Sequence, residues 1–184
     1  MDAHTITLLE QFDYDITTMD LKNEEINGLL DLNNFTNLTE LDCSYNLITQ
    51  LVNLPNSLTE LDCSYNEITQ LDNFPDSLIE LNCENNKIKQ LDNLPNSLIR
   101  LNCSTNKIKQ LDNLPNLLTT LDCMYNLLEQ LDNLPNSLSI LECYGNQIKQ
   151  FDNLPNSLTQ LCCNNNQINS NELKMKYPKI KIDN

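Results

Sequence analysis

The sequence predicts a repeat solenoid, in which copies of one short unit stack side by side into a parallel β-sheet. Cysteine recurs every 20 residues, at Cys43, Cys63, Cys83, Cys103, Cys123, Cys143 and Cys163. Asparagine keeps the same step from Asn46 to Asn166, and proline keeps it from Pro55 to Pro155. Such a period is typical of solenoids, because a single unit cannot bury its apolar face without neighbours. We therefore expect one elongated domain over residues 1–184.

The first half of each copy predicts a short strand. Leu61 and Cys63 are two residues apart and point to the same face of an extended segment, while Asp62 points to the other face. A strand over residues 60–64 then buries the leucine and the thiol, and its copies stack about 4.8 Å apart. Asn66 is expected to end the strand, because its amide can satisfy the turning backbone and its copies form a ladder.

The second half of each copy predicts a return wall with little regular structure. Ile68, Leu71 and Phe74 come back toward the interior at intervals of three residues. The Leu-Pro pair fixes φ at the proline and disfavours helix at the residue before it. Twenty residues leave little room for a full helix. The wall should therefore be extended, polyproline-like or 3-10.

Both ends of the chain depart from the repeat and predict short capping elements. Residues 1–15 form an N-terminal cap in which residues 5–12 are a short helix or strand, and residues 170–184 form a C-terminal cap. In the latter we expect a helix with a serine cap at Ser170, then a strand over residues 179–182 with lysines facing outward. Residues 38–169 hold the regular repeats. An atypical first repeat covers 16–37, with Glu24 in place of asparagine and these residues pointing inward: Ile16, Met19, Leu21, Ile26, Leu29 and Leu32.

Charge and cysteine content indicate an intracellular location. The formal net charge is −15, no apolar run approaches the length of a membrane span, and the first residues lack the pattern of a signal peptide. Stacked cysteines have parallel Cα–Cβ vectors, which is poor geometry for disulfides. Buried free thiols are the better interpretation, and they suit a reducing compartment. We expect a cytoplasmic protein with no membrane or nucleic-acid partner.

The pattern L-x-x-L-x-C-x-x-N-x-I-x-x-L-x-x-L-P resembles the leucine-rich repeat family in its short 20-residue form, over roughly residues 16–182. This resemblance implies an α/β-type solenoid with a curved right-handed parallel sheet on its concave face, and a protein-interaction function at that face. The asparagine-rich copies with Leu-Pro-Asn-Ser-Leu look most like repeats of giant DNA viruses of amoebae. They are also similar to repeat domains of bacterial effector ubiquitin ligases, whose catalytic domain is not expected here. Either origin implies a host protein as target.

The outward positions of the strands are the candidate binding surface. Its first half is acidic, and its second half is partly apolar, which favours a basic partner protein with apolar anchors. The alternative is that the acidic half only keeps the molecule in solution. A third outward column is expected to hold Ser44, Ser64 and Ser104. The candidate partner-binding residues are Glu60, Asp62, Glu80, Arg100, Asp122, Met124, Tyr125, Ile140, Glu142 and Tyr144.

Two further charged groups lie outside the strands. An aspartate column on the return wall could recruit cations, but hydrogen bonding to the local turn backbone and to water is the favoured interpretation. It consists of Asp72, Asp92, Asp112, Asp132 and Asp152. A small basic cluster consists of Lys87, Lys89, Lys107 and Lys109. Against the overall negative charge these lysines are expected to pair with carboxylates rather than with phosphate.

Catalysis is not expected. His4 is the only histidine and lies in the N-terminal cap, and Cys162 faces outward without a base. The carboxylates of a flat, wet face have nothing to push their pKa values apart. The cysteine spacing does not fit a zinc site, so we expect no metal and no cofactor.

The sequence therefore predicts a non-enzymatic protein-interaction module, present as a monomer or weak homodimer. One alternative is a structural, self-associating solenoid that serves as a scaffold or virion component. A second is an acidic protein that binds cations through the aspartate column.

Overall fold

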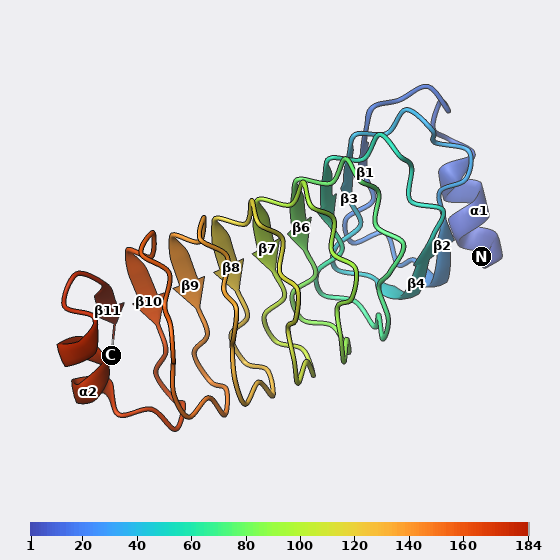
Figure 1. Cartoon of the computed structure of the whole chain (residues 1–184). Helices are drawn as coiled ribbons and strands as arrows, with labels where there is room; N and C mark the ends of the chain where they lie inside the picture. The colour runs from blue at the N-terminus through green and yellow to red at the C-terminus, as the bar shows by residue number, and fades with distance from the viewer. Residues whose placement is uncertain (184) are drawn as a thin grey trace.

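Each repeat contributes one three-residue strand to a parallel sheet that runs the length of the molecule. The structure is a computed structural model and describes residues 1–183. Asn184 of the predicted C-terminal cap lies outside the described residues. The strands stack in chain order along an elongated solenoid (Figure 1). They are β1 (Thr18–Asp20), β3 (Glu40–Asp42), β5 (Glu60–Asp62), β6 (Glu80–Asn82), β7 (Arg100–Asn102), β8 (Thr120–Asp122), β9 (Ile140–Glu142), β10 (Gln160–Cys162) and β11 (Lys181–Asp183). The predicted solenoid is confirmed.

The strands are in register, and the central residue of each strand from β1 to β10 in the main sheet points into the core; it is Met19 in β1 and a leucine in the others. Leu61 pairs with Leu41 on one side and Leu81 on the other, and all three are buried. The strand predicted over residues 60–64 is shorter than expected, because the Asp62 carboxylate accepts the Ser64 N–H at 2.9 Å and turns the chain. This turn explains a wrong expectation about the third column: its serines are buried instead of facing outward, namely Ser44, Ser64 and Ser104.

The predicted asparagine ladder is present and ties each repeat to the one before it. The Asn66 amide donates to the Cys63 carbonyl at 3.1 Å and to the Cys43 carbonyl of the preceding repeat at 2.9 Å. Its Oδ1 accepts the N–H of Ile48 at 2.9 Å. A single buried side chain thus satisfies backbone groups in two repeats that the sheet leaves unpaired.

The return wall is mostly irregular, as expected, apart from a second parallel sheet in the first two repeats. That sheet pairs β2 (Asn27–Asp31) with β4 (Leu47–Val52). Beyond it, the inward positions are filled as predicted, with Ile68 and Leu71 buried and Phe74 half-buried. In five of the six repeats with a Leu-Pro or Phe-Pro pair, the asparagine before that pair has a φ of 53° to 55°, a left-handed conformation that asparagine tolerates better than most residues. These asparagines are Asn53, Asn73, Asn93, Asn113 and Asn133.

The N-terminal end is covered by helix α1 (Ala3–Leu9), which begins slightly earlier than predicted. Asp2 caps it by accepting the Thr5 N–H at 2.7 Å, and Leu9 is buried against the first repeat. In that repeat Leu30 is fully buried in place of Leu29, so the expectation for Leu29 is wrong. A register shift between Gly28 and Leu29 explains the change, because a slip of one residue exchanges the two faces of a strand.

The C-terminal end is covered by helix α2 (Ser170–Lys176) and by β11. The helix cap is Asn169 rather than Ser170; its side chain accepts the N–H groups of Asn171 and Glu172. Leu173 is buried against the last repeat. Strand β11 pairs in parallel with β10 and begins two residues later than predicted, with Lys181 exposed at the edge.

The cysteines are free, as expected. Seven of the eight are buried in the core, and Cys162 is half-buried on the outer face of the sheet. Burial raises the pKa of the ladder thiols, for example that of Cys163 to about 11, so they remain protonated. Neither of the helices within residues 1–183 has the length and apolar character needed to cross a membrane.

Candidate binding surface

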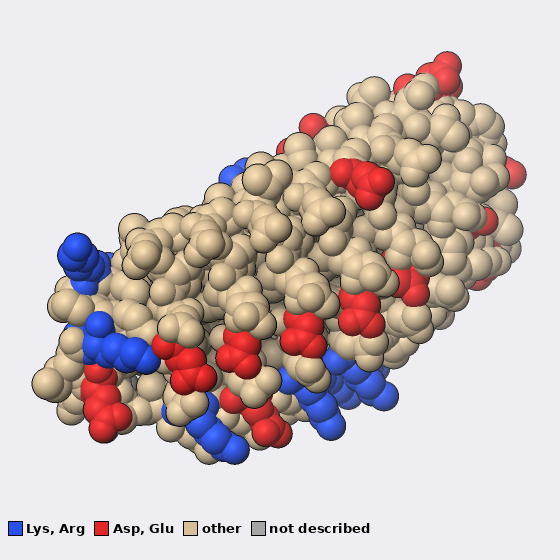
Figure 2. Space-filling model, viewed as in Figure 1, with Lys and Arg blue, Asp and Glu red and all other residues tan. Residues whose placement is uncertain are grey.

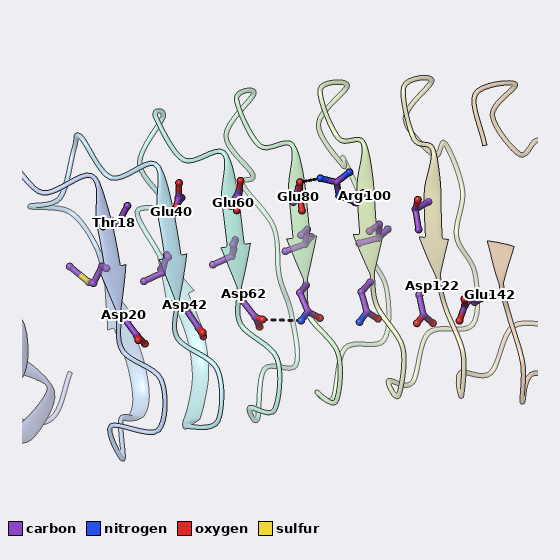
Figure 3. Close-up of a pocket in the computed structure, with 18 residues that line it drawn as sticks. Thr18, Asp20, Glu40, Asp42, Glu60, Asp62, Glu80, Arg100, Asp122 and Glu142 are labelled. Atoms are coloured by element: carbon purple, nitrogen blue, oxygen red, sulfur yellow. Dashed lines mark hydrogen bonds and ion pairs between the residues drawn. The ribbon is translucent and has the colours of Figure 1, made fainter. Parts of the chain in front are cut away.

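The outer face of the main sheet forms a groove of about 660 Å³ that extends from β1 to β9 (Figure 3). Two columns of side chains rise from it. The first column holds the residue before each buried central residue: Thr18, Glu40, Glu60, Glu80, Arg100, Thr120 and Ile140. Ile140 continues this column on β9 but does not line the groove. The second column holds the residue after it: Asp20, Asp42, Asp62, Asn82, Asn102, Asp122 and Glu142.

The first column changes from acidic to apolar along the solenoid. Glu40 and Glu60 are direct neighbours on β3 and β5, and no described side chain forms an ion pair or hydrogen bond with either carboxylate. Glu80 instead pairs with Arg100 on the next strand (Figure 3). Ile140, two strands beyond Arg100, is half-buried. The basic residue expected to contact a partner is therefore already held by a carboxylate of the same face.

The second column also maintains the fold. The Asp62 carboxylate accepts the Ser64 hydroxyl at 2.6 Å and the Asn82 amide at 2.9 Å, besides the Ser64 N–H. Asp42 and Asp122 accept the N–H two residues further on in the same way. Hydrophobic periodicity does not reveal this role, which limits how freely the column can serve a partner.

Asp122 has an unusual environment toward the C-terminal end of the groove. The pKa of Asp122 is raised to about 6, chiefly by burial; the charges of Glu142 and Glu84 contribute to the rise, and the hydrogen bond from the Met124 N–H opposes it. The expectation that nothing on this face pushes carboxyl pKa values apart is therefore wrong. The groove excludes enough water to penalise one carboxylate.

The C-terminal half of the surface holds aromatic rings in fixed positions. The rings of Tyr125 and Tyr144 meet edge to face with centroids 5.1 Å apart. Tyr144 Oη accepts a hydrogen bond from the Asn165 amide at 2.5 Å. Tyr125 also packs over Gly145, where an added Cβ would lie 2.9 Å from its ring. Met124 is half-buried beside them, whereas Tyr125 remains 55% exposed.

A second aromatic pair, which the sequence analysis missed, lies at the N-terminal half. Tyr45 and Tyr65 stack with ring centroids 4.4 Å apart and planes 5° from parallel. Lys22 Nζ lies 5.3 Å from the Tyr45 centroid, and the Tyr65 hydroxyl donates to Glu84 at 3.3 Å. Both tyrosines occupy the same position in the repeat as Tyr125, and that shared position is the signal that could have identified them.

The charged groups outside the groove are engaged locally. A regular row of acidic side chains runs along the solenoid in Figure 2. Four of the five return-wall aspartates, all but Asp132, accept from the glutamine two residues earlier, as in Gln70 to Asp72 at 2.7 Å. The expected hydrogen bond to the turn backbone is therefore wrong for these four. Among residues 1–183 no group of three or more potential ligands is placed to hold a metal ion. Of the clustered lysines in the described chain, Lys87 alone pairs with a carboxylate, that of Glu67.

Comparison with known proteins yields matches to one repeat family. The family described as Leucine Rich repeats (2 copies) matches residues 36–76. YopM from Yersinia enterocolitica WA-314 is 37% identical over 72% of this chain and 30% of its own, with a TM-score of 0.71. The functional domain of InlJ from Listeria monocytogenes, described as including a cysteine ladder, is 35% identical over 83% of this chain and 35% of its own, with a TM-score of 0.74.

A third solved structure matches over nearly the full length. The Shigella effector LRR domain is 25% identical over 98% of this chain and 85% of its own, with a TM-score of 0.78. The chain spans only about a third of the YopM and InlJ structures. No curated protein matches the sequence.

Proposed function

We propose that this chain is a leucine-rich repeat protein that binds a partner protein in the groove of its main sheet. The match of residues 36–76 to that family and the fold shared with solved leucine-rich repeat structures support this, because such proteins are generally protein-interaction modules. In this proposal it acts as a non-enzymatic adaptor or decoy. The partner contacts the acidic strands through basic groups and the aromatic half through apolar anchors.

The observation that carries the proposal is the rigid exposure of Tyr125. Its ring is 55% exposed, yet Gly145 and Tyr144 hold it in one position. An aromatic side chain that is already ordered loses little conformational entropy on binding, and this is typical of anchor residues at interfaces. Ile140 and Met124, both half-buried, lie in the same two repeats and add apolar surface beside the C-terminal end of the groove.

A host-cell protein is the proposed kind of partner. The likeness to the Shigella effector LRR domain supports this. Eight free cysteines, most of them in the core, support a reducing intracellular compartment as the place of action.

The environment of Cys162 supports a non-enzymatic role. Partial burial raises the pKa of Cys162, and the neighbouring carboxylates of Glu142 and Asp183 raise it further. A nucleophilic cysteine needs the opposite surroundings, with a base or a positive charge that favours the thiolate.

The proposal is tested by affinity capture from host-cell lysate with three forms of the protein. The wild type is compared with a Met124→Glu/Ile140→Glu/Tyr144→Glu variant, and with an Asn96→Glu/Asn116→Glu/Asn136→Glu control that adds the same charge at exposed turns outside the groove. Each form is first checked for native circular dichroism. We expect a protein retained by the wild type and the control but not by the groove variant, and then direct binding of that purified protein.

The opposing results are equally clear. Capture of the same set by all three forms, or of nothing, contradicts the proposal. Sedimentation then checks the structural alternative, in which the solenoid self-associates through its ends or sides, so that the wild type and the groove variant both self-associate.

A further inference from the structure

We infer that the outer face of the main sheet takes an extended peptide segment of the partner, with basic side chains in the groove over Glu40 and Glu60 and an apolar side chain at Ile140 on β9, five to seven residues further along. This inference rests on the proposed function and specifies the chemistry of the partner. It also fixes the middle of the segment as non-basic, because Arg100 lies between the two ends.

The acidic end of the proposed peptide site consists of two carboxylates without a cationic partner in the described chain. Glu40 and Glu60 are directly opposite each other on adjacent parallel strands, and within residues 1–183 neither carboxylate has a side-chain partner. Like charges at directly opposed positions destabilise a sheet, so a cation seated between them relieves the repulsion. The two glutamates line the groove and are exposed, so a ligand can reach both carboxylates.

The chain's own cations demonstrate both kinds of contact that a basic peptide would make here. The Arg100 guanidinium pairs with Glu80, the next carboxylate in the same column. The Lys22 ammonium lies over the Tyr45 ring at the edge of the same half. A partner arginine at Glu40 and Glu60 repeats the first contact one strand earlier, in the one stretch of the column where the carboxylates are unpaired.

The apolar end belongs to the same column. Ile140 follows Arg100 and Thr120 on consecutive strands, so a segment that crosses the strands meets all three in turn. Ile140 is half-buried, and Tyr125 and Tyr144 are held in fixed positions at the strand ends of the same two repeats. This arrangement suits a leucine- or phenylalanine-sized side chain.

The spacing of the two anchors follows from the geometry of the sheet. Four strand intervals separate Glu60 from Ile140. At about 4.8 Å each they span about 19 Å. An extended peptide advances about 3.3 Å per residue, so its two anchors are about six residues apart. Arg100 lies halfway between Glu60 and Ile140. It therefore disfavours a positive side chain about three residues after the peptide residue that lies over Glu60.

Fluorescence anisotropy with synthetic labelled peptides tests the inference. Each peptide carries two adjacent arginines and one leucine, separated by glycine, serine and threonine spacers of one, three, five, seven or nine residues. A further peptide has lysine or arginine at every position. In about 0.15 M salt, which screens long-range attraction, we expect the five-residue spacer to bind at least about tenfold tighter than the shortest and longest spacers and the fully basic peptide.

Three variants locate the contacts. Glu40→Gln/Glu60→Gln should weaken every arginine-containing peptide by about tenfold or more, whereas Ile140→Glu should remove the preference for one spacer. Glu129→Gln/Asp132→Asn removes two exposed charges of the return wall and should change nothing.

Equal affinity for all spacers, or tightest binding of the fully basic peptide, would overturn the inference, because either result means attraction by net charge alone. If no peptide binds while groove-dependent capture of a partner persists, this inference fails and the proposed function stands. Loss of groove-dependent capture defeats the proposed function instead.

Discussion

Replacing Asn106 by alanine tests the asparagine ladder, because this side chain makes four hydrogen bonds in the core. Its amide donates to the carbonyls of Cys83, Cys103 and Ser104 at 2.9, 3.2 and 3.1 Å. Its Oδ1 accepts the Ile88 N–H at 3.0 Å. All four partners belong to the backbone, so the substitution removes contacts from two repeats at once.

The expected cost follows from which partners remain satisfied. The Cys83 and Cys103 carbonyls also accept from Asn86 and Asn126, and the Ser104 carbonyl accepts the Asn85 N–H. Only the Ile88 N–H is left buried without an acceptor, and this unsatisfied donor lowers the free energy of unfolding by about 1–3 kcal/mol. With about 1 kcal/mol for the weakened carbonyl contacts, we expect the free energy of unfolding to fall by about 2–4 kcal/mol.

Urea unfolding followed by circular dichroism measures this difference, with Asn96→Ala as the matched control. Asn96 is exposed in a turn and should change the stability by less than about 0.5 kcal/mol. Asn106→Asp adds a second comparison: it keeps the acceptor for Ile88 but turns a carboxylate toward three carbonyls, so it should destabilise more than alanine at neutral pH. Equal stability of Asn106→Ala and Asn96→Ala would refute the reasoning.

Three further predictions concern the groove and the core. Because the pKa of Asp122 is about 6 when folded and 3.8 ordinarily, the folded state holds a proton that the unfolded state releases, and stability falls as pH rises from about 4 to 6. After allowance for solvent screening, Asp122→Asn should therefore raise the free energy of unfolding by about 1–2 kcal/mol above pH 6 and leave it unchanged below pH 4, as measured by urea titration across pH. Gly145→Ala should lower the stability by about 1–2 kcal/mol in thermal melts, because φ at this residue is +70° and the new Cβ meets the Tyr125 ring. Adding Tyr125→Ala should recover the part of this loss that comes from the contact. Full stability of the Gly145→Ala variant would contradict the prediction. In the native protein, an aromatic disulfide reagent should label Cys162 slowly and no other cysteine, whereas all eight cysteines should react after unfolding. Rapid labelling of several cysteines in the native protein would show that the cysteine ladder is not buried as described.

The sequence predicted the inner columns of the solenoid well because burial alone dictates them. A period of two within the strand and of 20 between copies places Leu61, Cys63 and Ile68 inside with no further information. It misplaced Ser64 because hydrophobic periodicity does not report that the Asp62 side chain accepts the Ser64 N–H and ends the strand early. Competition between side chain and ladder for a backbone group is visible only in three dimensions.

The candidate site was predictable in position but not in chemistry. Alternation identifies the exposed columns, and whether they bind a partner stays a prediction. The pair of Tyr45 and Tyr65 was missed because it follows the strand, at residues with φ of 57° and 53°, where alternation no longer applies. The raised pKa of Asp122 depends on how far the groove excludes water, which no residue pattern records.

The asparagine ladder also makes the hydrogen bonding of each repeat depend on the repeat that follows it in the chain. Asn66 completes the hydrogen bonding of Cys43 and Ile48, which precede it in the chain by 23 and 18 residues. During synthesis from the N-terminus, the backbone hydrogen bonds of a repeat are therefore complete only after the next repeat has been made and has folded onto it. The atypical repeat over residues 16–37 has Glu24 where asparagine would stand, and the segment before it holds helix α1. Ordered structure should thus advance along the nascent chain one repeat behind the growing end.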